Sequence, residues 1–313
     1  MVGNAPTYRI AVLMGGRSAE REVSLTTGSQ VATALRERGH EVLAIDTGDT
    51  EFIGELAVTM PDVVFICLHG RFGEDGTVQG LLELLGLRYV GSGVLASALA
   101  MDKVMSKHFF AHAGIPTPAY VHVRRTDEID LDEATCLLGP KTVVKPANEG
   151  SAIGVTIAHT PAELPSALEE AFRHDSSVLI EEFVSGVEVT VGVIGNENPI
   201  ALPTIEIVPE HEFYDYESKY VPGMSQHIIP ARVTEEVRAE CARVSLLAHS
   251  VLGCRGMSRA DTIVTNEGRV ELLEVNTIPG MTPTSLLPDA AAAAGIGFPE
   301  LCDRLVRLAL EDA

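Results

Sequence analysis

Residues 259–276, "RADTIVTNEGRVELLEVN", contain two short runs of alternating apolar and polar residues, joined by a turn at Asn266-Glu267-Gly268. This pattern predicts a β-hairpin. A two-residue loop at Glu267-Gly268 sets the register so that Asp261 lies opposite Glu274. Side chains alternate between the two faces of a strand, so one face of the hairpin collects the polar groups. That face carries four side chains: Arg259, Asp261, Glu274 and Asn276.

Two directly opposed carboxylates on a sheet repel each other unless a cation lies between them. A divalent cation is the natural occupant, because Mg²⁺ prefers oxygen ligands and takes one or two carboxylates together with phosphate oxygens. Asp261, Glu274 and Asn276 supply only oxygen ligands of this kind. The alternative is a solvated sheet face with scattered charges, and the geometry of the hairpin leaves both interpretations open.

Composition limits the class of protein. A length of 313 residues suggests two or three domains, and 46% hydrophobic residues support substantial cores. The net charge of −21 disfavours nucleic acids and anionic membranes as partners. The start "MVGNAPTYRI" lacks a secretory pattern, and no apolar run approaches the roughly 18 residues that span a bilayer. Five dispersed cysteines without a CxxC pair argue against a zinc site or disulfides, so we expect a soluble, reducing, cytoplasmic setting.

Strands and helices alternate in the first hundred residues. "YRIAVLMGG" (residues 8–16), "HEVLAID" (40–46) and "PDVVFICLHG" (61–70) are predicted strands, with helical patterns after the first and third. This alternation predicts a parallel, doubly wound sheet in residues 1 to about 100. Further along, residues 209–227 have tyrosines and charges but no period, which is typical of a long functional loop.

No GxxxxGK[ST] loop is present, and no GxGxxG follows the first strand, so a nucleotide would not be held in either of those ways. "EGSAIG" (residues 149–154) is a different glycine-rich loop, which follows the predicted strand bearing Lys145. Backbone amides of such a loop can cradle phosphates, and Lys145 could neutralise one. Glycine-rich hairpin loops without a ligand are also common, and this alternative stays open.

Three other side chains are candidates by position. His69 follows the third predicted strand and Glu20 follows the first, at the edge of an open α/β sheet where ligands bind. Lys103 lies near a predicted helix start. The alternatives are a structural histidine, a carboxylate that favours the helix N-terminus through the macrodipole, and a solvated lysine.

Five segments occur in a fixed order: "GGRSAEREVSL" (15–25), "HGRFGEDGTVQGLLELLGLRYVGSGVLASALAMDK" (69–103), "VVKPANEGSAIGV" (143–155), "FYDYESKY" (213–220) and "LLEVNTIPGMTPTSLLP" (272–288). Together they resemble the ATP-grasp D-alanine–D-alanine ligases over essentially the whole chain. The resemblance implies an α/β fold, α+β overall, with three domains. These are an N-terminal substrate-binding domain with a doubly wound parallel sheet (1–102), a central ATP-grasp domain (103–185) and a C-terminal ATP-grasp domain (186–313) with the metal site and a lid loop (209–227).

The resemblance also implies an activity: ATP-dependent joining of two D-alanines through an acyl phosphate, for peptidoglycan synthesis. ATP and two Mg²⁺ or Mn²⁺ ions would be the cofactors, and D-alanine and ATP the small-molecule partners. A cytoplasmic location and a homodimer are further expectations from the family.

Residue roles follow from the same resemblance. Asp261, Glu274 and Asn276 would ligate the metal ions. The residues expected to contact ATP are Lys103, Lys145, Ser151, Glu181, Phe183, Val184, Glu188, Phe213 and Lys219.

For the amino-acid substrates, Glu20 would bind the ammonium group of the first D-alanine, linked to Ser151 and Tyr220, and His69 would line the pocket. Ser285 and the Leu286 amide would hold the second carboxylate. Arg259 and the Gly280 amide would stabilise the tetrahedral oxyanion. The residues expected to act in catalysis are therefore Glu20, Ser151, Tyr220, Arg259 and Gly280.

The chain also departs from the family pattern. Glu182 stands where many members have lysine at the adenine hinge, Ala152 replaces a common serine, and Ile278 replaces a small residue. "SRAD" (258–261) stands where "GRID" is frequent. These departures leave room for an altered substrate preference.

Three other functions compete with the ligase interpretation. The nearest is an ATP-grasp ligase with another acceptor, such as D-lactate or a different amino acid of a natural-product pathway. Tyr220 in "ESKY" resembles the pattern of the dipeptide-forming members, which favours the amine acceptor. A nucleotide-binding regulator without turnover is disfavoured by the complete Asp261, Glu274 and Asn276 set. A nicotinamide-dependent oxidoreductase is disfavoured by the missing glycine fingerprint.

Overall fold

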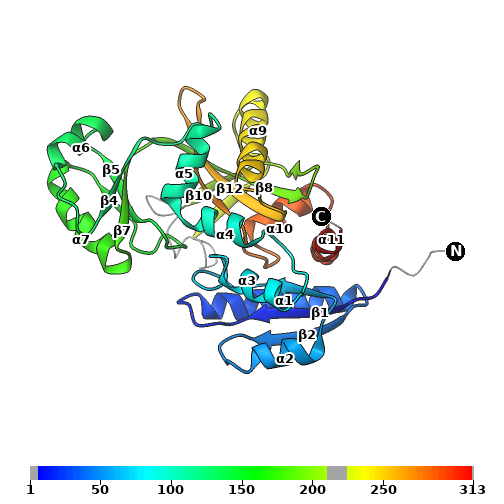
Figure 1. The fold of residues 1–313 in the computed structure, drawn as a ribbon. Helices are drawn as coiled ribbons and strands as arrows, with labels where there is room; N and C mark the ends of the chain where they lie inside the picture. The colour runs from blue at the N-terminus through cyan, green and yellow to red at the C-terminus, as the bar shows by residue number, and fades with distance from the viewer. Residues whose placement is uncertain (1–5, 210–223, 312–313) are drawn as a thin grey trace.

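Three β-sheets and the helices around them form the molecule in this computed structural model, which describes residues 6–209 and 224–311 (Figure 1). The N-terminal sheet is parallel, in the order β2-β1-β3, which confirms the predicted α/β start. Its central strand is fully buried from Ile10 to Leu13, as a parallel sheet covered on both faces requires. The elements are β1 (Arg9–Met14), α1 (Arg21–Glu37), β2 (Glu41–Asp46), α2 (Phe52–Thr59), β3 (Val63–Ile66) and α3 (Thr77–Leu84).

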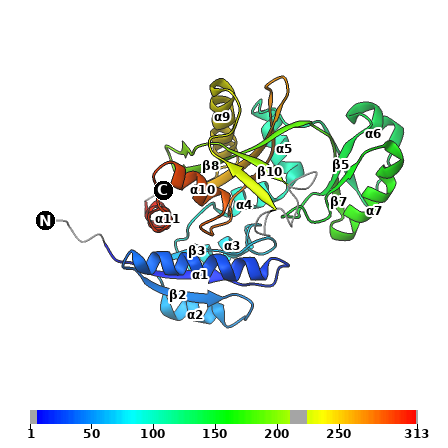
Figure 2. The same cartoon turned by 180° about the vertical axis from the view of Figure 1, so that it is seen from behind.

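The second sheet is antiparallel, with four strands in the order β4-β7-β5-β6. Helices α6 and α7 lie beside it at one end of the molecule, away from the parallel sheet in both views (Figures 1 and 2). The elements are β4 (Tyr120–Arg124), α6 (Leu131–Leu138), β5 (Thr142–Pro146), β6 (Thr156–Ala158), the 3₁₀ turn η1 (Pro161–Glu163), α7 (Leu164–His174) and β7 (Ser177–Glu182).

The third sheet has six strands, in the order β11-β10-β8-β12-β13 with β9 paired to β8. Helix α9 packs its apolar face on β8, β12 and β13. The elements are β8 (Gly186–Gly195), β9 (Ile200–Ala201), β10 (Ile205–Pro209), β11 (Ser225–Ile228), α9 (Glu235–Val251), β12 (Gly256–Thr265), β13 (Val270–Asn276), α10 (Leu286–Ala293) and α11 (Phe298–Leu310).

The cores cross the predicted domain limits. Helices α4 (Val94–Met101) and α5 (Lys103–His112) contact β13, and α5 contributes Phe110 to the core under α9. Helices α10 and α11 share a core with the parallel sheet. The hydrophobic cores therefore do not test the predicted domain limits, and the division into 1–102, 103–185 and 186–313 remains a prediction. Both limits of the long loop expected at 209–227 are corrected: Pro209 lies in β10, and residues 225–227 lie in β11 and pair with β10.

The β12–β13 hairpin has the predicted pairing at its polar end, but a turn of a different length and a β-bulge produce it. Asp261 pairs with Glu274 and Arg259 with Asn276, as expected. The turn, however, has three residues, since Thr265 bonds Arg269 across it and Gly268 takes a positive φ of 81°. A β-bulge between Thr262 and Asp261 adds one residue in β13 and restores the predicted register.

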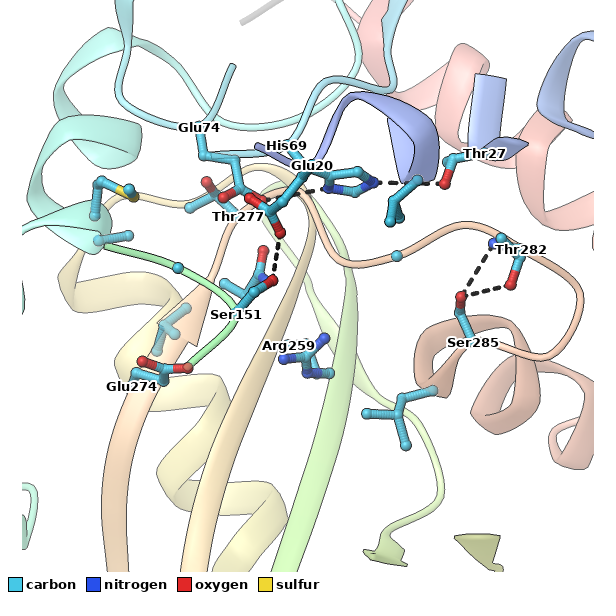
Figure 3. A pocket seen from close by; sticks show the side chains of 18 of the residues that line it. Glu20, Thr27, His69, Glu74, Ser151, Arg259, Glu274, Thr277, Thr282 and Ser285 are labelled. Atoms are coloured by element: carbon cyan, nitrogen blue, oxygen red, sulfur yellow. Dashed lines mark hydrogen bonds and ion pairs between the residues drawn. The ribbon is translucent and has the colours of Figure 1, made fainter. Parts of the chain in front are cut away.

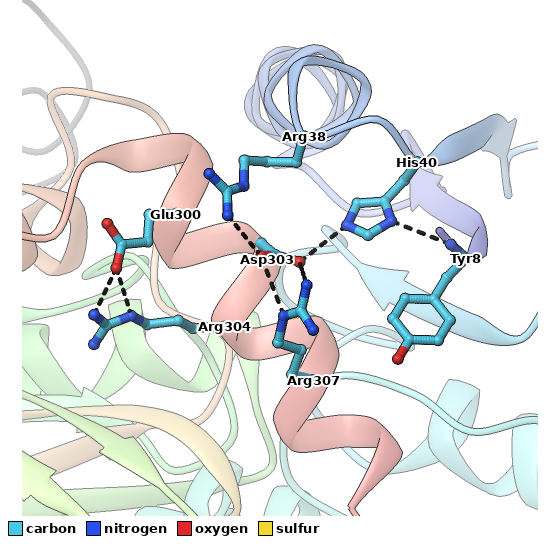
Figure 4. A network of polar contacts seen from close by, with 7 residues as sticks. All are labelled: Tyr8, Arg38, His40, Glu300, Asp303, Arg304 and Arg307. Carbon is cyan, nitrogen blue, oxygen red and sulfur yellow. Dashed lines mark hydrogen bonds and ion pairs between the residues drawn. The ribbon is translucent and has the colours of Figure 1, made fainter. Parts of the chain in front are cut away.

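A buried carboxylate joins the C-terminal helix to the parallel sheet (Figure 4). Asp303 of α11 is 3% exposed and accepts hydrogen bonds from Arg38, His40 and Arg307 at 3.0 to 3.2 Å. The Tyr8 amide donates to His40 Nδ1, so His40 Nε2 is the atom that donates to Asp303. Burial alone would raise the pKa of Asp303, but the bonds from Arg307, His40 and Arg38 lower it overall. This network fixes α11 against α1 and β2.

No helix in the described ranges is both long and apolar enough to cross a bilayer.

We predict that Asp303→Asn lowers the free energy of unfolding by about 1–3 kcal/mol, because the buried His40 and two partly exposed arginines lose a buried charged acceptor. Glu300→Gln is the control, since Glu300 pairs with Arg304 in an exposed i,i+4 bridge on the same helix, which is worth below about 1 kcal/mol. Urea unfolding measures both. Because folding lowers the pKa of Asp303, its carboxylate stabilises the folded protein fully above the ordinary aspartate pKa of about 4. This stabilisation is lost as the pH falls through the lowered pKa. Equal stabilities of the two variants at pH 7 would contradict this assignment.

Candidate active site

Two cavities meet between the three sheets. The larger, of about 460 Å³, lies between the parallel sheet and the polar ends of β12 and β13. The smaller, of about 190 Å³, lies between the four-stranded and six-stranded sheets. Five residues line both cavities and so form a shared wall: Lys103, Glu149, Gly150, Ser151 and Glu274. A ligand group at this wall is accessible from either side.

The shared wall carries both signs of charge. Lys103 Nζ lies 2.6 Å from the Glu149 carbonyl oxygen and 3.5 Å from Glu274 Oε2. Burial and the Asp175 carboxylate raise the pKa of Glu149. Ser151 and Ala152 have positive φ angles of 50° and 58°, which is uncommon for residues other than glycine. The "EGSAIG" loop therefore turns sharply at the point where the two cavities join.

The parallel sheet provides a polar wall of the larger cavity (Figure 3). Glu20, only 5% exposed, follows β1 and accepts a hydrogen bond from the Ser151 hydroxyl. His69 follows β3, with Nε2 3.5 Å from the Thr27 hydroxyl and Nδ1 3.6 Å from Glu74. Glu20, His69 and Ser151 are thus brought together from segments far apart in the sequence, as the resemblance implies.

The opposite wall of the larger cavity is formed by the segment that follows β13 (Figure 3). Ser285 precedes the first residue of α10, and its hydroxyl lies 3.1 Å from the Thr282 amide and 2.8 Å from the Thr282 hydroxyl. Leu286 opens α10, and the first amides of a helix favour an anion. A Cβ at Gly280 would lie 3.0 Å from the Ser285 hydroxyl oxygen, so only glycine leaves that hydroxyl where it is.

The opposed carboxylates lie where β12 and β13 reach the cavities. Arg259 donates to Asp261 from Nε at 2.9 Å and from Nη2 at 2.7 Å, and the Thr190 hydroxyl donates to Oδ1 at 2.6 Å. Asp261 and Glu274 both line the smaller cavity, as does the bulge residue Leu273. The bulge therefore determines which residues of β13 reach this cavity.

The donor set fits a hard divalent cation. Asp261 Oδ2 accepts one bond, from Arg259, and a carboxylate oxygen has a second lone pair. Asn276 Oδ1 likewise accepts one bond, from the Ile278 amide. In the described part of the chain no three His, Cys, Asp or Glu side chains converge on one point. An ion held here would therefore take its remaining ligands from phosphate oxygens or water, which is the usual coordination of Mg²⁺.

The smaller cavity contains the residues expected at the nucleotide. Lys145, Phe183, Val184 and Glu188 line it together with Glu181. Glu181 is almost fully buried, and its carboxylate lies between two lysines, 2.8 Å from Lys145 Nζ and 3.0 Å from Lys107 Nζ. Burial alone would raise the pKa of Glu181, but Lys145 and Lys107 lower it overall. The side chain expected at the adenine hinge is therefore also the anchor of Lys145.

Position 182 has a carboxylate, and a different lysine lies beside the neighbouring Phe183. The Glu182 carboxylate accepts a bond from the Ala119 amide at the edge of β4. Lys141, which precedes β5, places its ammonium group 3.7 Å from the centre of the Phe183 ring. Such a cation–π contact holds the ring as a wall of the cavity. Sequence reasoning missed Lys141 and Lys107, although Lys107 lies four residues after Lys103 and hence on the same face of a helix.

Three predicted contacts, Phe213, Lys219 and Tyr220, lie outside the described residues.

Known proteins match this chain over nearly its full length. A family model described as D-ala D-ala ligase C-terminus matches residues 109–307, and one described as D-ala D-ala ligase N-terminus matches residues 49–92. A D-alanine–D-alanine ligase of Pelotomaculum thermopropionicum is 47% identical, with 98% of each chain covered. One of Halalkalibacterium halodurans is 51% identical, with 97% of this chain and 99% of the relative covered.

Solved structures agree with the sequence relatives. The D-alanine–D-alanine ligase of Bacillus anthracis in complex with ATP superposes with a TM-score of 0.85 at 35% identity, covering 97% of this chain and 98% of that one. The VanG D-Ala:D-Ser ligase of Enterococcus faecalis has a TM-score of 0.84 at 31% identity, covering 97% and 100%. The chain belongs to the D-alanine–D-alanine ligase family, with the ATP-grasp fold that the resemblance implied.

Proposed function

We propose that this chain joins two D-alanines to D-alanyl-D-alanine at the expense of ATP, a step of peptidoglycan precursor synthesis. The observation that carries the proposal is the shared wall, which includes Lys103, Ser151 and Glu274 and lies where a larger polar cavity meets a smaller one lined by Lys145. A phosphoryl group bound at this wall has an acceptor carboxylate on one side and its nucleotide on the other. Family membership supports the same reaction.

ATP occupies the smaller cavity in this proposal. Phe183 and Val184 contact the base, Glu188 the ribose, and Lys103 and Lys145 the phosphates. Phe213 and Lys219 are assigned to ATP from the family resemblance alone. The Bacillus anthracis ligase was solved in complex with ATP, which supports a nucleotide site on this fold.

Asp261, Glu274 and Asn276 hold two Mg²⁺ or Mn²⁺ ions in the proposed complex. Bound there, the ions supply charge stabilisation during phosphoryl transfer. The chain's own residues prepare the site: the bulge in β13 brings Glu274 opposite Asp261, and Arg259 keeps the Asp261 carboxylate in a fixed plane.

The two D-alanines occupy the larger cavity. Glu20, fixed by the Ser151 hydroxyl, holds the ammonium group of the first, and His69 lines its side. Ser285 and the Leu286 amide hold the carboxylate of the second at the N-terminus of α10. Tyr220 completes the Glu20–Ser151 pair by family resemblance.

The reaction proceeds in two steps. The carboxylate of the first D-alanine attacks the γ-phosphorus of ATP, which gives an acyl phosphate and ADP. The free amine of the second D-alanine then attacks the acyl carbon, and phosphate leaves as the peptide bond forms. Arg259 and the Gly280 amide stabilise the tetrahedral oxyanion between these states, since fixed donors aimed at developing charge lower the barrier.

A second candidate is a ligase for another acceptor, such as D-serine, D-lactate or another amino acid. The solved D-Ala:D-Ser ligase at 31% identity supports it, because this acceptor is accommodated on the same fold. We favour D-alanine, since the more similar relatives, at 47–52% identity, are D-alanine–D-alanine ligases.

The remaining proposals concern the setting of the enzyme. We place it in the cytoplasm, where ATP is available, with ATP and D-alanine as its partners. A homodimer is the family default.

Supplied with ATP, Mg²⁺ and equal D-alanine, D-serine and D-lactate as acceptors, the enzyme is expected to make mainly D-Ala-D-Ala near pH 7. Phosphate release and product analysis by mass spectrometry measure the ratio. A dominant D-Ala-D-Ser or D-Ala-D-lactate product would show that D-serine or D-lactate, and not D-alanine, is the preferred acceptor. No ADP formation with any of the three would overturn the ligase proposal.

Glu274→Gln should lower kcat about 10²-fold or more, because a group that stabilises transition-state charge loses its own charge. The protein should still fold, since the side chain of Glu274 is 30% exposed and glutamine has nearly the same shape. Glu267→Gln in the exposed turn of the same hairpin is the control and should keep wild-type kcat. Near-normal turnover of the Glu274 variant with Mg²⁺ would refute the metal assignment.

Gly280→Ala should raise KM for the acceptor D-alanine about tenfold, because the added methyl displaces the Ser285 hydroxyl and overpacking costs about 1–2 kcal/mol. KM for ATP should change little. Gly297→Ala is the matched control, since its Cβ would meet open space at an ordinary φ of −66°. Initial rates at varied concentrations of D-alanine and ATP give both KM values. An unchanged KM for the acceptor would show that the Ser285 hydroxyl does not bind the acceptor.

A further inference from the structure

A fully buried lysine lies behind the smaller cavity and does not line it. Lys107 extends from α5 with 0% exposure, one helical turn after Lys103. Its ammonium group lies 2.5 Å from the Thr117 hydroxyl, 3.4 Å from the Pro118 carbonyl oxygen and 3.0 Å from Glu181 Oε1. A buried ammonium group is costly unless it is paired and hydrogen-bonded, and these three partners provide that.

Lys107, Glu181 and Lys145 form a triad of charges with Glu181 in contact with both lysines. Glu181 uses Oε1 toward Lys107 and Oε2 toward Lys145, which lies 2.8 Å away. Only Glu181 and Lys145 reach the cavity surface. With Lys107 protonated, two positive charges and one negative charge leave the triad with a net charge of about +1. Without Lys107, Glu181 would cancel the charge of Lys145.

We propose that Lys107 is a positioning residue for the nucleotide: it neutralises Glu181 from behind, so that Lys145 presents a net positive charge to an ATP phosphate. This inference rests on the proposed ATP site. It assigns Lys107 no contact with the nucleotide, and its effect passes entirely through Glu181.

The environment of Lys107 gives the effect a pH dependence. Burial lowers the pKa of Lys107 to about 8, although Glu181 opposes this shift. The other charged groups that act on it are Lys145, which lowers its pKa further, and Glu271, which raises it, and its ammonium group lies 5.3 Å from the centre of the Tyr120 ring. Because the pKa of a lysine is lowered here, the neutral form is favoured above about pH 8. Loss of that proton removes the net charge of the triad.

Binding of a non-hydrolysable ATP analogue and of adenosine, measured by calorimetry, tests the proposal. Lys107→Met should weaken binding of the analogue about tenfold, because Glu181 then pairs with Lys145 alone and cancels the positive charge that Lys145 presents to the phosphate. Binding of adenosine, which has no phosphate, should change less than about twofold on the same electrostatic argument. Equal losses for both ligands would show a merely structural role for Lys107.

A double-mutant cycle identifies the route of the effect. In a Glu181→Gln background, Lys107→Met should alter analogue binding far less than it does in wild type, because no carboxylate is left to draw the Lys145 ammonium group away from the phosphate. Additive effects of the two substitutions would overturn the proposal.

The wild-type protein provides a further test. Its affinity for the analogue should fall as pH rises from 7 to 9, with adenosine affinity unchanged over the same range. A flat profile for the analogue, together with wild-type analogue binding by the Lys107→Met variant, would contradict the role of Lys107. Failure of the wild type to bind the analogue at pH 7 would instead count against the proposed ATP site itself.

Discussion

Asp261 and Glu274 face each other across β12 and β13, and such a pair of carboxylates requires positive charge beside it. Arg259 supplies it to Asp261 through two hydrogen bonds, and Lys103 lies 3.5 Å from Glu274. Both cations come from segments that also line the larger cavity. The two cations that balance this repulsion therefore connect the hairpin to the elements that build the shared wall. A lone pair on Asp261 Oδ2 remains for a metal ion.

The same balance of charge is repeated around the smaller cavity, where we propose that ATP binds. Glu181 is held between Lys145 and Lys107, and Glu20 accepts a bond from Ser151 on the other side of the wall. Each carboxylate fixes a partner that faces a cavity. The chain has a net charge of −21, so an anionic phosphate needs lysines held at defined positions. The partners of Lys103 and Lys145 set those positions.

Much of this arrangement follows from the sequence, and the rest depends on distant contacts. The pairing of Asp261 with Glu274 was predicted correctly, although from a two-residue turn, whereas the chain uses a three-residue turn and a compensating bulge. A bulge has no clear sequence signal, because Leu273 looks like an ordinary strand residue. Lys107 and Lys141 were missed for a similar reason: their roles depend on Glu181 and Phe183, which are more than forty residues away.

The central claim is that a carboxylate in the larger cavity receives the phosphoryl group at the shared wall. D-alanine labelled with ¹⁸O in both carboxylate oxygens tests it directly, by mass spectrometry of the phosphate released during turnover. The account predicts one ¹⁸O atom in each phosphate, because the acyl phosphate breaks at its labelled C–O bond. Unlabelled phosphate accompanying formation of the dipeptide would contradict it.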